Sequence, residues 1–439
     1  MSRIFLAGPL LFILLALSCG GEEVSLDRPN IIIVIIDTLR ADHLGCYGYS
    51  RNTSPQLDSL AAAGTRWSNF QAQAPWTLPA TATIFTGLNV RQHGSGRRGD
   101  GDHVLHAEVP TIPSIFEAAG YATCGIFNVC VLSEQMGFAR GFDYYSCAEY
   151  GVDRAAETVD EFILWLEGLE GERPFLAVLH VFDVHQPYDP PPPYDGMFIE
   201  DDTLESVYWE ITDEGEIAHP EHLEYFLARY DGSIRLVDDQ LGRLFEHLRS
   251  TGLSDSAVVV VTADHGEEFL ERGWIGHGGH LYQEMLHVPL IISGPGIEAG
   301  RTIDTPAGQM DILPTMLSLA SIDTDTFLQG MDILDPETPE RRPLPAGSLM
   351  FRGAMAGGTP LAAVRYGDVK GVVTRRGSTD SYYIYDLATD PHERDPMEAD
   401  RVMMEILDHY RSTPRIWNPE RVAELDSAST RALQDLGYI

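Results

Sequence analysis

Four apolar runs without polar alternation mark the chain, at Asn30–Ile36, Phe175–Val181, Ala257–Thr262 and Val288–Ile292. Continuous runs of this kind are typical of strands buried on both faces of a parallel sheet, because helices cover the two faces. Patterns with helical spacing separate them, at Ser54–Ala63, Arg154–Leu169 and Glu221–Leu248. Strands that alternate with helices predict an α/β fold, with a large, mostly parallel sheet sandwiched by helices.

The pattern changes toward the C-terminus of this chain of 439 residues. Short strand-like pieces fill Leu361–Leu387, and a helical pattern follows from about Pro396 to Tyr410. We therefore expect a main domain over residues 30–339 and a smaller C-terminal α+β subdomain over residues 340–439. The stretches Pro187–Tyr194 and Glu200–Glu216 are interpreted as an insertion over one rim of the sheet, which serves substrate specificity or is a plain surface loop.

Acidic and histidine residues directly follow three of the apolar runs. Asp37 follows the first run, Asp183 and His185 follow the second, and Asp264 and His265 follow the third. Ligands of open α/β sheets bind outside the carboxyl ends of the strands. Three separate segments are thus expected to converge on one rim, which is where we look for a functional site.

The N-terminus carries Arg3, an apolar run from Ile4 to Leu17, and then Cys19. The run is too short to span a bilayer and is typical of a secretory signal. Residues 16–19, Ala-Leu-Ser-Cys, resemble a bacterial lipobox, which predicts a signal peptide over residues 1–18, lipidation of Cys19 and a linker over residues 19–29. On this interpretation the protein is an exported bacterial lipoprotein held to the membrane by its N-terminal lipid. The alternative is an ordinary secretory peptide that happens to contain a cysteine.

The charge is strongly acidic, with 66 acidic against 30 basic residues and a formal net charge of −36. Nucleic acid is therefore excluded as a partner. An anionic ester would be repelled at long range, so a site for one must be locally positive, through a metal ion and nearby basic residues. The densest basic cluster is Arg91, Arg97 and Arg98, which suits either such a site or a solvated loop.

Beyond Cys19 the chain has only Cys46, Cys124, Cys130 and Cys147. They contain no CxxC pair of the kind that binds zinc. Export permits one disulfide among Cys124, Cys130 and Cys147, but buried free thiols are the expected state.

Thr77 stands at the start of a segment that suits a nucleophile. Pro79, two residues on, favours the first turn of a helix, and the N–H groups and dipole of a helix N-terminus favour an anion there. Coordination to a metal would activate the hydroxyl. In isolation, a Thr-x-Pro sequence more commonly marks a threonine that caps a helix.

Several segments together resemble the sulfatase family of the alkaline-phosphatase superfamily. They are residues 30–42 with Asp37, the Thr77–Gly87 segment, His180–Tyr188, Val261–Glu267, and Tyr385–Leu387 with Glu393. In that family a cysteine or serine is oxidised to formylglycine, and Thr77 takes its place. A threonine carbinol carries a methyl group and cannot become the aldehyde, so no formylglycine is expected and Thr77 would act as an alkoxide.

The resemblance implies a ligand set of Asp37, Thr77, Asp264 and His265 for one divalent cation: Ca²⁺, Mg²⁺ or Mn²⁺ by its oxygen atoms, with Zn²⁺ admitted by its imidazole. It implies that His185 and His277 contact the ester oxygens or protonate the leaving group. His280 receives no role beyond support of another ligand. The alternative is a two-metal phosphodiesterase whose second site uses Asp183, His185 and His277, with or without His280.

Four positions depart from the family pattern: Thr38, Thr81, Asn128 and Cys130 stand where an aspartate, an arginine, a lysine and a histidine are usual. The basic side chains that bind the sulfate group in this family are thus largely missing. We expect an exported, metal-dependent hydrolase or transferase that attacks sulfate, phosphate or phosphonate esters, on a glycan or a lipid headgroup, through Thr77. A catalytically inactive lipoprotein that binds anionic glycans is the competing interpretation.

Overall fold

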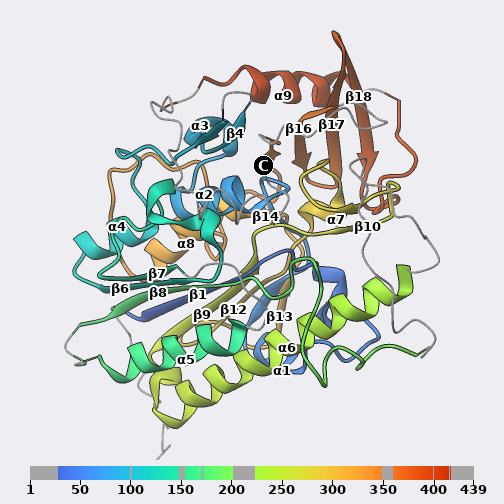
Figure 1. Ribbon diagram of the computed structural model, residues 1–439. Helices are drawn as coiled ribbons and strands as arrows, with labels where there is room; N and C mark the ends of the chain where they lie inside the picture. Colours follow the sequence, from blue (N-terminus) through green and yellow to red (C-terminus); the bar gives the residue numbers. More distant parts are fainter. Residues whose placement is uncertain are drawn as a thin grey trace, which may run out of the picture.

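An eight-stranded sheet lies at the centre of the computed structural model, in the order β13-β2-β12-β9-β1-β8-β6-β7 (Figure 1). The structure describes residues 28–98, 101–147, 154–169, 171, 173–200, 223–348, 359–398, 400–414 and 416. The strands of this sheet are β1 (Asn30–Ile36), β2 (Thr65–Trp67), β6 (Ala122–Phe127), β7 (Tyr144–Cys147), β8 (Phe175–Val181), β9 (Ala257–Ala263), β12 (Leu290–Ser293) and β13 (Arg301–Ile303).

The predicted mostly parallel sheet is confirmed. β1 pairs in parallel with β8 on one side and β9 on the other, and β6 and β7 continue the parallel order. β12 runs antiparallel between β9 and β2. Its sequence had the same continuous apolar run as the others, because burial on both faces sets that pattern whichever way the strand points.

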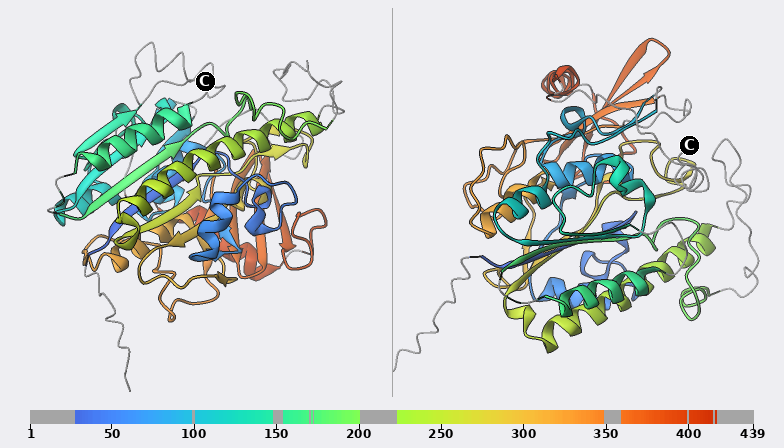
Figure 2. Two further views of the ribbon diagram at one scale, coloured as in Figure 1. Left: turned by 90° about the horizontal axis from the view of Figure 1, so that it is seen from below. Right: turned by 60° about the vertical axis from the view of Figure 1, so that its left-hand side comes forward.

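Helices cover both faces of the sheet, as the edge-on view in Figure 2 shows. On one face lie α1 (Pro55–Ala62), α5 (Arg154–Glu167) and α6 (Leu223–Ser250). On the other lie α2 (Thr77–Thr86), α4 (Ile112–Ala118) and α8 (Ile312–Leu319), with α3 (Val90–His93) next to α2. The three helices expected from the sequence therefore form, each within two residues of its expected bounds.

The C-terminal part is a four-stranded antiparallel sheet of β15 (Pro343–Ala346), β16 (Thr359–Tyr366), β17 (Val369–Arg376) and β18 (Thr379–Asp386), packed against α9 (Arg401–Ser412) (Figure 1). The helix begins five residues later than expected, because Asp400 caps it by accepting a hydrogen bond from the Val402 N–H. The division of the chain at residue 340 stays a prediction.

Short elements complete the described fold: β3 (Phe70–Gln71), β4 (Gly96–Arg98), β5 (Gly101–His103), β10 (Glu268–Phe269), β11 (Ile275–Gly276), α7 (Gln283–Leu286) and β14 (Ala307–Gly308). Of the four described cysteines, Cys124 and Cys130 are buried, as expected for thiols of the core. The Cys147 thiol lies 3.3 Å from the Val129 carbonyl oxygen.

The predicted signal peptide, Cys19 and nearly all of the linker lie outside the described residues, as do residues 201–216 of the acidic stretch. Export and lipidation therefore stay predictions. No helix in the described ranges has the length and apolar character needed to cross a membrane.

A buried ion pair ties the C-terminal sheet to the main domain. Lys370 on β17 donates to Glu393 at 3.1 Å, and Glu393 also accepts from the Gln283 N–H of α7 at 2.6 Å. Both charged side chains are almost fully buried. Arg375, on the same strand, makes an exposed pair with Asp380 at 2.7 Å.

These two pairs give a matched test of stability. Lys370→Met leaves the Glu393 carboxylate buried without its cation, so it is expected to lower the free energy of unfolding by about 3–5 kcal/mol. Arg375→Met is expected to leave the free energy of unfolding almost unchanged, because solvent screens the exposed pair. Urea unfolding followed by circular dichroism measures both, and equal losses would contradict the buried-pair interpretation.

Candidate active site

Three buried side chains meet where β1 and β9 end. Asp37 follows β1, and Asp264 and His265 follow β9. The His265 Nε2 atom lies 3.6 Å from an oxygen of Asp37 and 3.5 Å from an oxygen of Asp264. All three side chains are fully buried, and they form the only group of three or more metal-ligating side chains within mutual reach in the described part of the chain. The expected convergence of strand ends therefore produces a compact group of ligand atoms.

Thr77 belongs to the same group. It is the first residue of α2, and its hydroxyl lies 3.3 Å from Asp37 Oδ2 and 3.4 Å from His265 Nε2. The N-cap of α2 is Trp76, which makes no side-chain capping bond, so the helix start does not use the Thr77 hydroxyl as its cap. Every residue of α2 is buried, which fixes this N-terminus against the end of the sheet.

The electrostatics of the group favour a bound cation. Burial raises the pKa of Asp37 well above its ordinary value, and the charges of Asp264 and Glu267 raise it further. Burial acts on Asp264 in the same direction, but His265 and His180 outweigh it and lower its pKa. One oxygen of each carboxylate, Asp37 Oδ1 and Asp264 Oδ2, accepts no hydrogen bond from any described residue. Two buried carboxylates, a hydroxyl and an imidazole fit a divalent metal ion, which would satisfy these unpaired oxygens.

His265 belongs to this group, and His185 and His277 lie beside it; hydrogen bonds orient all three rings. The Nδ1 atoms of His265 and His185 lie 2.8 and 2.7 Å from the carbonyl oxygens of Gly266 and Gln186. A carbonyl only accepts, so each Nδ1 carries the proton and each Nε2 keeps its lone pair. The His277 Nδ1 lies 3.0 Å from a carboxylate oxygen of Glu267, which orients that ring.

The rings lie close enough to act on one substrate. The His277 ring centroid is 4.6 Å from that of His265 and 4.7 Å from that of His185. Burial, and then the neighbouring His277, lower the pKa of His185 to about 3, so His185 is neutral. Burial raises the pKa of Glu267 to about 7. The structure thus brings His185 and His277, both expected from the sequence, to the Thr77 group.

Asp183 and His280 do not join the group. The two oxygens of Asp183 accept from the Asn128 side chain at 3.0 Å and from the Ala155 N–H at 2.9 Å, which ties Asp183 to the start of α5. The Nε2 atom of His280 lies 2.5 Å from Glu268. The second metal site that the sequence left open would use Asp183, with or without His280, and each of these side chains is held by other partners.

All four positions that depart from the family pattern are buried. Thr38 has a positive φ of 55° and its N–H donates to Asp264 at 3.2 Å, which holds that carboxylate in place. Cys130 is buried.

The basic cluster expected from the sequence is described only in part. The Arg91 Nε–H donates to the Thr413 carbonyl oxygen at 3.5 Å. Arg97 and Arg98 lie in β4, and their side chains are outside the described residues.

His180 and Glu267 are the site residues that the sequence analysis left without a role. His180 lies on β8, 3.6 Å from Asp37 Oδ2 and 4.0 Å from Asp264 Oδ2. A histidine within the apolar run Phe175–Val181 was the available signal, since a strand core otherwise excludes polar side chains. Glu267 stood beside the matched Asp264-His265-Gly266 motif, but its contact with His277 depends on tertiary structure.

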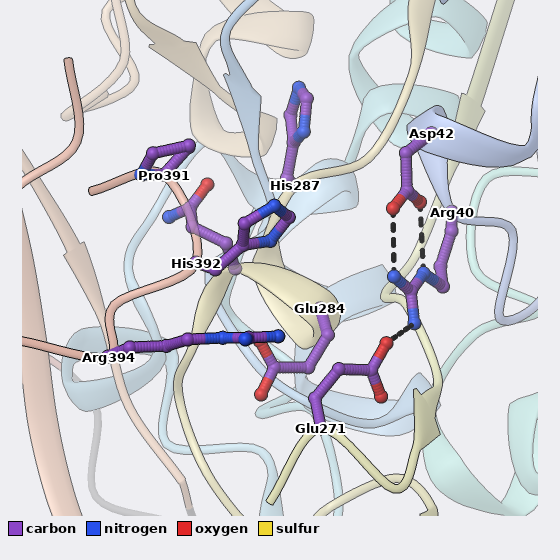
Figure 3. Close-up of a pocket in the computed structure, with 9 residues that line it drawn as sticks. Arg40, Asp42, Glu271, Glu284, His287, Pro391, His392 and Arg394 are labelled. Atoms are coloured by element: carbon purple, nitrogen blue, oxygen red, sulfur yellow. Dashed lines mark hydrogen bonds and ion pairs between the residues drawn. The ribbon is translucent and has the colours of Figure 1, made fainter. Parts of the chain in front are cut away.

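A charged cavity lies next to the site (Figure 3). Arg40 pairs with Asp42 at 2.8 Å and with Glu271 at 2.6 Å, and it also donates to the Glu267 carbonyl at 2.9 Å. His392 and Arg394 enter the cavity from the C-terminal part. The Arg40 side chain thereby stabilises the backbone at Glu267.

The sequence matches a family model described as sulfatase over residues 29–322. An uncharacterized sulfatase, YidJ, of Escherichia coli K12 is 27% identical over 375 residues, which cover 71% of this chain and 72% of that protein. An N-acetylglucosamine-6-O-sulfatase of Bacteroides thetaiotaomicron is 24% identical and covers 74% of each chain.

Two solved structures share the fold. The structure of BT4656 in complex with its substrate, D-glucosamine-2-N,6-O-disulfate, superposes with a TM-score of 0.73 at 21% identity, over 88% of this chain and 97% of that chain. The phosphonate monoester hydrolase of Agrobacterium radiobacter superposes with a TM-score of 0.68 at 21% identity, over 87% and 94%. The alkaline-phosphatase-like architecture expected from the sequence is therefore confirmed.

Replacement of Gly266 tests whether the segment after Asp264 and His265 must pack closely against α7. A Cβ atom at Gly266 would lie 2.0 Å from the Glu284 carbonyl oxygen, so Gly266→Ala forces the chain at Asp264 and His265 to move. We expect Mn²⁺ affinity to fall by about tenfold or more. Gly196→Ala is the control, since its Cβ meets no atom within 4 Å. Calorimetric titration with Mn²⁺ measures both, and parental affinity in Gly266→Ala would contradict this placement.

Proposed function

The chain belongs to the sulfatase family, and from that premise we propose that it is a metal-dependent ester hydrolase or transferase with Thr77 as its nucleophile. The observation that carries the proposal is the place of the Thr77 hydroxyl, 3.3 Å from Asp37 and 3.4 Å from His265. A side chain that only starts a helix has no reason to lie among buried metal-ligating atoms. The formylglycine route is closed to a threonine, so its own oxygen is the one available to attack.

Asp37, Thr77, Asp264 and His265 would hold one divalent cation. Such a cation lowers the pKa of a coordinated hydroxyl and offsets the negative charge of an anionic ester. The unpaired oxygens of Asp37 and Asp264 support this role. They also speak against an inactive binding protein, since nothing in glycan binding alone requires two buried, unpaired carboxylate oxygens.

In the first chemical step Thr77 Oγ1, as the alkoxide that a bound cation would stabilise, forms a bond to sulfur or phosphorus while the bond to the leaving oxygen breaks. His277 gives its Nε2 proton to that oxygen, and Glu267, 3.0 Å from Nδ1, stabilises the imidazolium before transfer. In the second step a water or an acceptor alcohol attacks the Thr77 ester and gives its proton to His277, which is neutral after the first step, so the imidazolium is restored. Thr77 is then regenerated, and the acceptor decides between hydrolysis and transfer.

The substrate that we propose is a sulfate, phosphate or phosphonate ester on a glycan or a lipid headgroup. The shared fold supports this range, because BT4656 acts on a disulfated glucosamine and another structural neighbour is a phosphonate monoester hydrolase. At the position where the family has a lysine, Asn128 donates to Asp183, so this side chain supplies no positive charge for a sulfate. We also propose export as a lipoprotein, from the signal-like residues 1–18 and Cys19.

Replacement of Thr77 tests the nucleophile. With Mn²⁺ or Ca²⁺, on a panel of aryl phosphodiester, phosphonate monoester and sulfate ester substrates, Thr77→Ala is expected to lower kcat by about 10³-fold or more. Thr77→Ser keeps the hydroxyl and is expected to stay within about tenfold. Thr81→Val, one turn along α2, removes a hydroxyl without a hydrogen-bond partner and serves as the control. Equal rates in Thr77→Ala and the parent would rule out the nucleophile.

Esters with different leaving groups test whether His277 is the general acid. An alkoxide needs a proton to depart whereas a nitrophenolate does not, so His277→Gln is expected to lower kcat by about 10²-fold for alkyl esters and by less than about fivefold for 4-nitrophenyl esters. Steady-state kinetics on both ester types give the comparison. An equal loss for both would remove His277 from the role of acid.

A further inference from the structure

His180 has an unusual environment for a histidine in the centre of a sheet. It lies on β8, where it is paired with Ile35 of β1 and Phe127 of β6, and its side chain is fully buried. Neither ring nitrogen makes a hydrogen bond to any described residue. A buried polar group without a partner costs free energy, so a histidine retained here needs a compensating interaction.

Two other histidines of the chain, the buried His93 and the partly buried His287, show the usual arrangement. His93 has Nε2 3.1 Å from the Thr83 hydroxyl, and its Nδ1 accepts from the Ser95 N–H at 3.1 Å. His287 has Nε2 2.9 Å from the Ser68 carbonyl oxygen. These side chains are satisfied by protein partners alone. His180 instead has the metal-ligating carboxylates as its nearest polar neighbours.

The distances place His180 Nε2 at the edge of the ligand group. It lies 3.6 Å from Asp37 Oδ2 and 4.0 Å from Asp264 Oδ2, which is too long for a hydrogen bond. Atoms that share one metal ion at about 2.1 Å lie about 3 to 4 Å from each other. The distances from Thr77 and His265 to the same carboxylates, 3.3 to 3.6 Å, fall in this range too.

We propose that His180 Nε2 is a further ligand of the cation held by Asp37, Thr77, Asp264 and His265. This inference rests on the metal site of the proposed function and adds a residue to it. It accounts at once for the unpaired nitrogen of His180 and for the unpaired oxygens of Asp37 and Asp264.

The added imidazole changes which metal the site prefers. Two nitrogen and three oxygen ligands suit Mn²⁺ or Zn²⁺, whereas Ca²⁺ prefers oxygen ligands throughout. His265 donates its Nδ1 proton to the Gly266 carbonyl, which strengthens its Nε2 as a donor. His180 has no such acceptor among the described residues, so it is the weaker imidazole ligand. Its loss should therefore weaken binding without abolishing it.

Pulsed electron paramagnetic resonance of the Mn²⁺-loaded full chain counts the coordinated imidazole nitrogens. Two are expected in the parent, from His265 and His180, and one in His180→Phe, which keeps a ring of similar size beside Phe127. Competition titrations should show Zn²⁺ binding about 100-fold weaker in His180→Phe and Ca²⁺ binding changed by less than about threefold. His93→Gln is the control: it removes a buried histidine that has ordinary hydrogen-bond partners, so the variant should keep the parental spectrum.

The outcomes separate this inference from the proposed function. A single nitrogen in the parent overturns the role of His180 and leaves the metal site standing, provided that Asp264→Asn loses Mn²⁺. A parent that binds no Mn²⁺ or Zn²⁺ overturns both. The parental spectrum decides the matter even if His180→Phe fails to fold, and unchanged Zn²⁺ affinity in a folded His180→Phe also counts against the ligand.

Discussion

The site depends on two aspartate carboxylates buried side by side at the ends of adjacent parallel strands. Asp37 and Asp264 are fully buried, and their ligand atoms lie within 4.8 Å of each other. Two unit charges at that separation repel by about 3 kcal/mol at the effective dielectric constant that suits protein interiors. Desolvation adds to this cost and raises the pKa of Asp37. The pair is therefore costly without a cation, and the surrounding residues are best understood as a site built to hold one.

The fold supplies this arrangement by simple means. β1 lies between β8 and β9, so the residues that follow these strands share one rim. The buried helix α2 brings Thr77 to that rim from the opposite layer. Gln309 links the segment after β9 to the segment that precedes α2. Its side chain donates to the Asp264 carbonyl at 2.5 Å and accepts from the Gln73 N–H at 3.0 Å. The residues that we propose as metal ligands and nucleophile are thus held by the same packed core.

The sequence predicted the strands and the convergence of their ends well, because burial on two faces leaves a clear apolar run. It gave the bounds of β1 and β8 as the structure has them. It did not reveal the direction of β12, since an antiparallel strand with both faces covered has the same pattern. Nor did it reveal that Asp183 bonds Asn128 or that His180 approaches Asp37, because side-chain orientation depends on tertiary neighbours.

Within this family, the proposed chemistry depends on Thr77, because we propose that its own oxygen attacks the ester. Rapid quenching during turnover, followed by mass spectrometry of the peptide that contains Thr77, tests this most directly. The account predicts that this peptide gains the mass of one sulfuryl or phosphoryl group, localised to the Thr77 side chain. An unmodified Thr77 peptide during a product burst equal to the enzyme present, or the group on another residue, would contradict it.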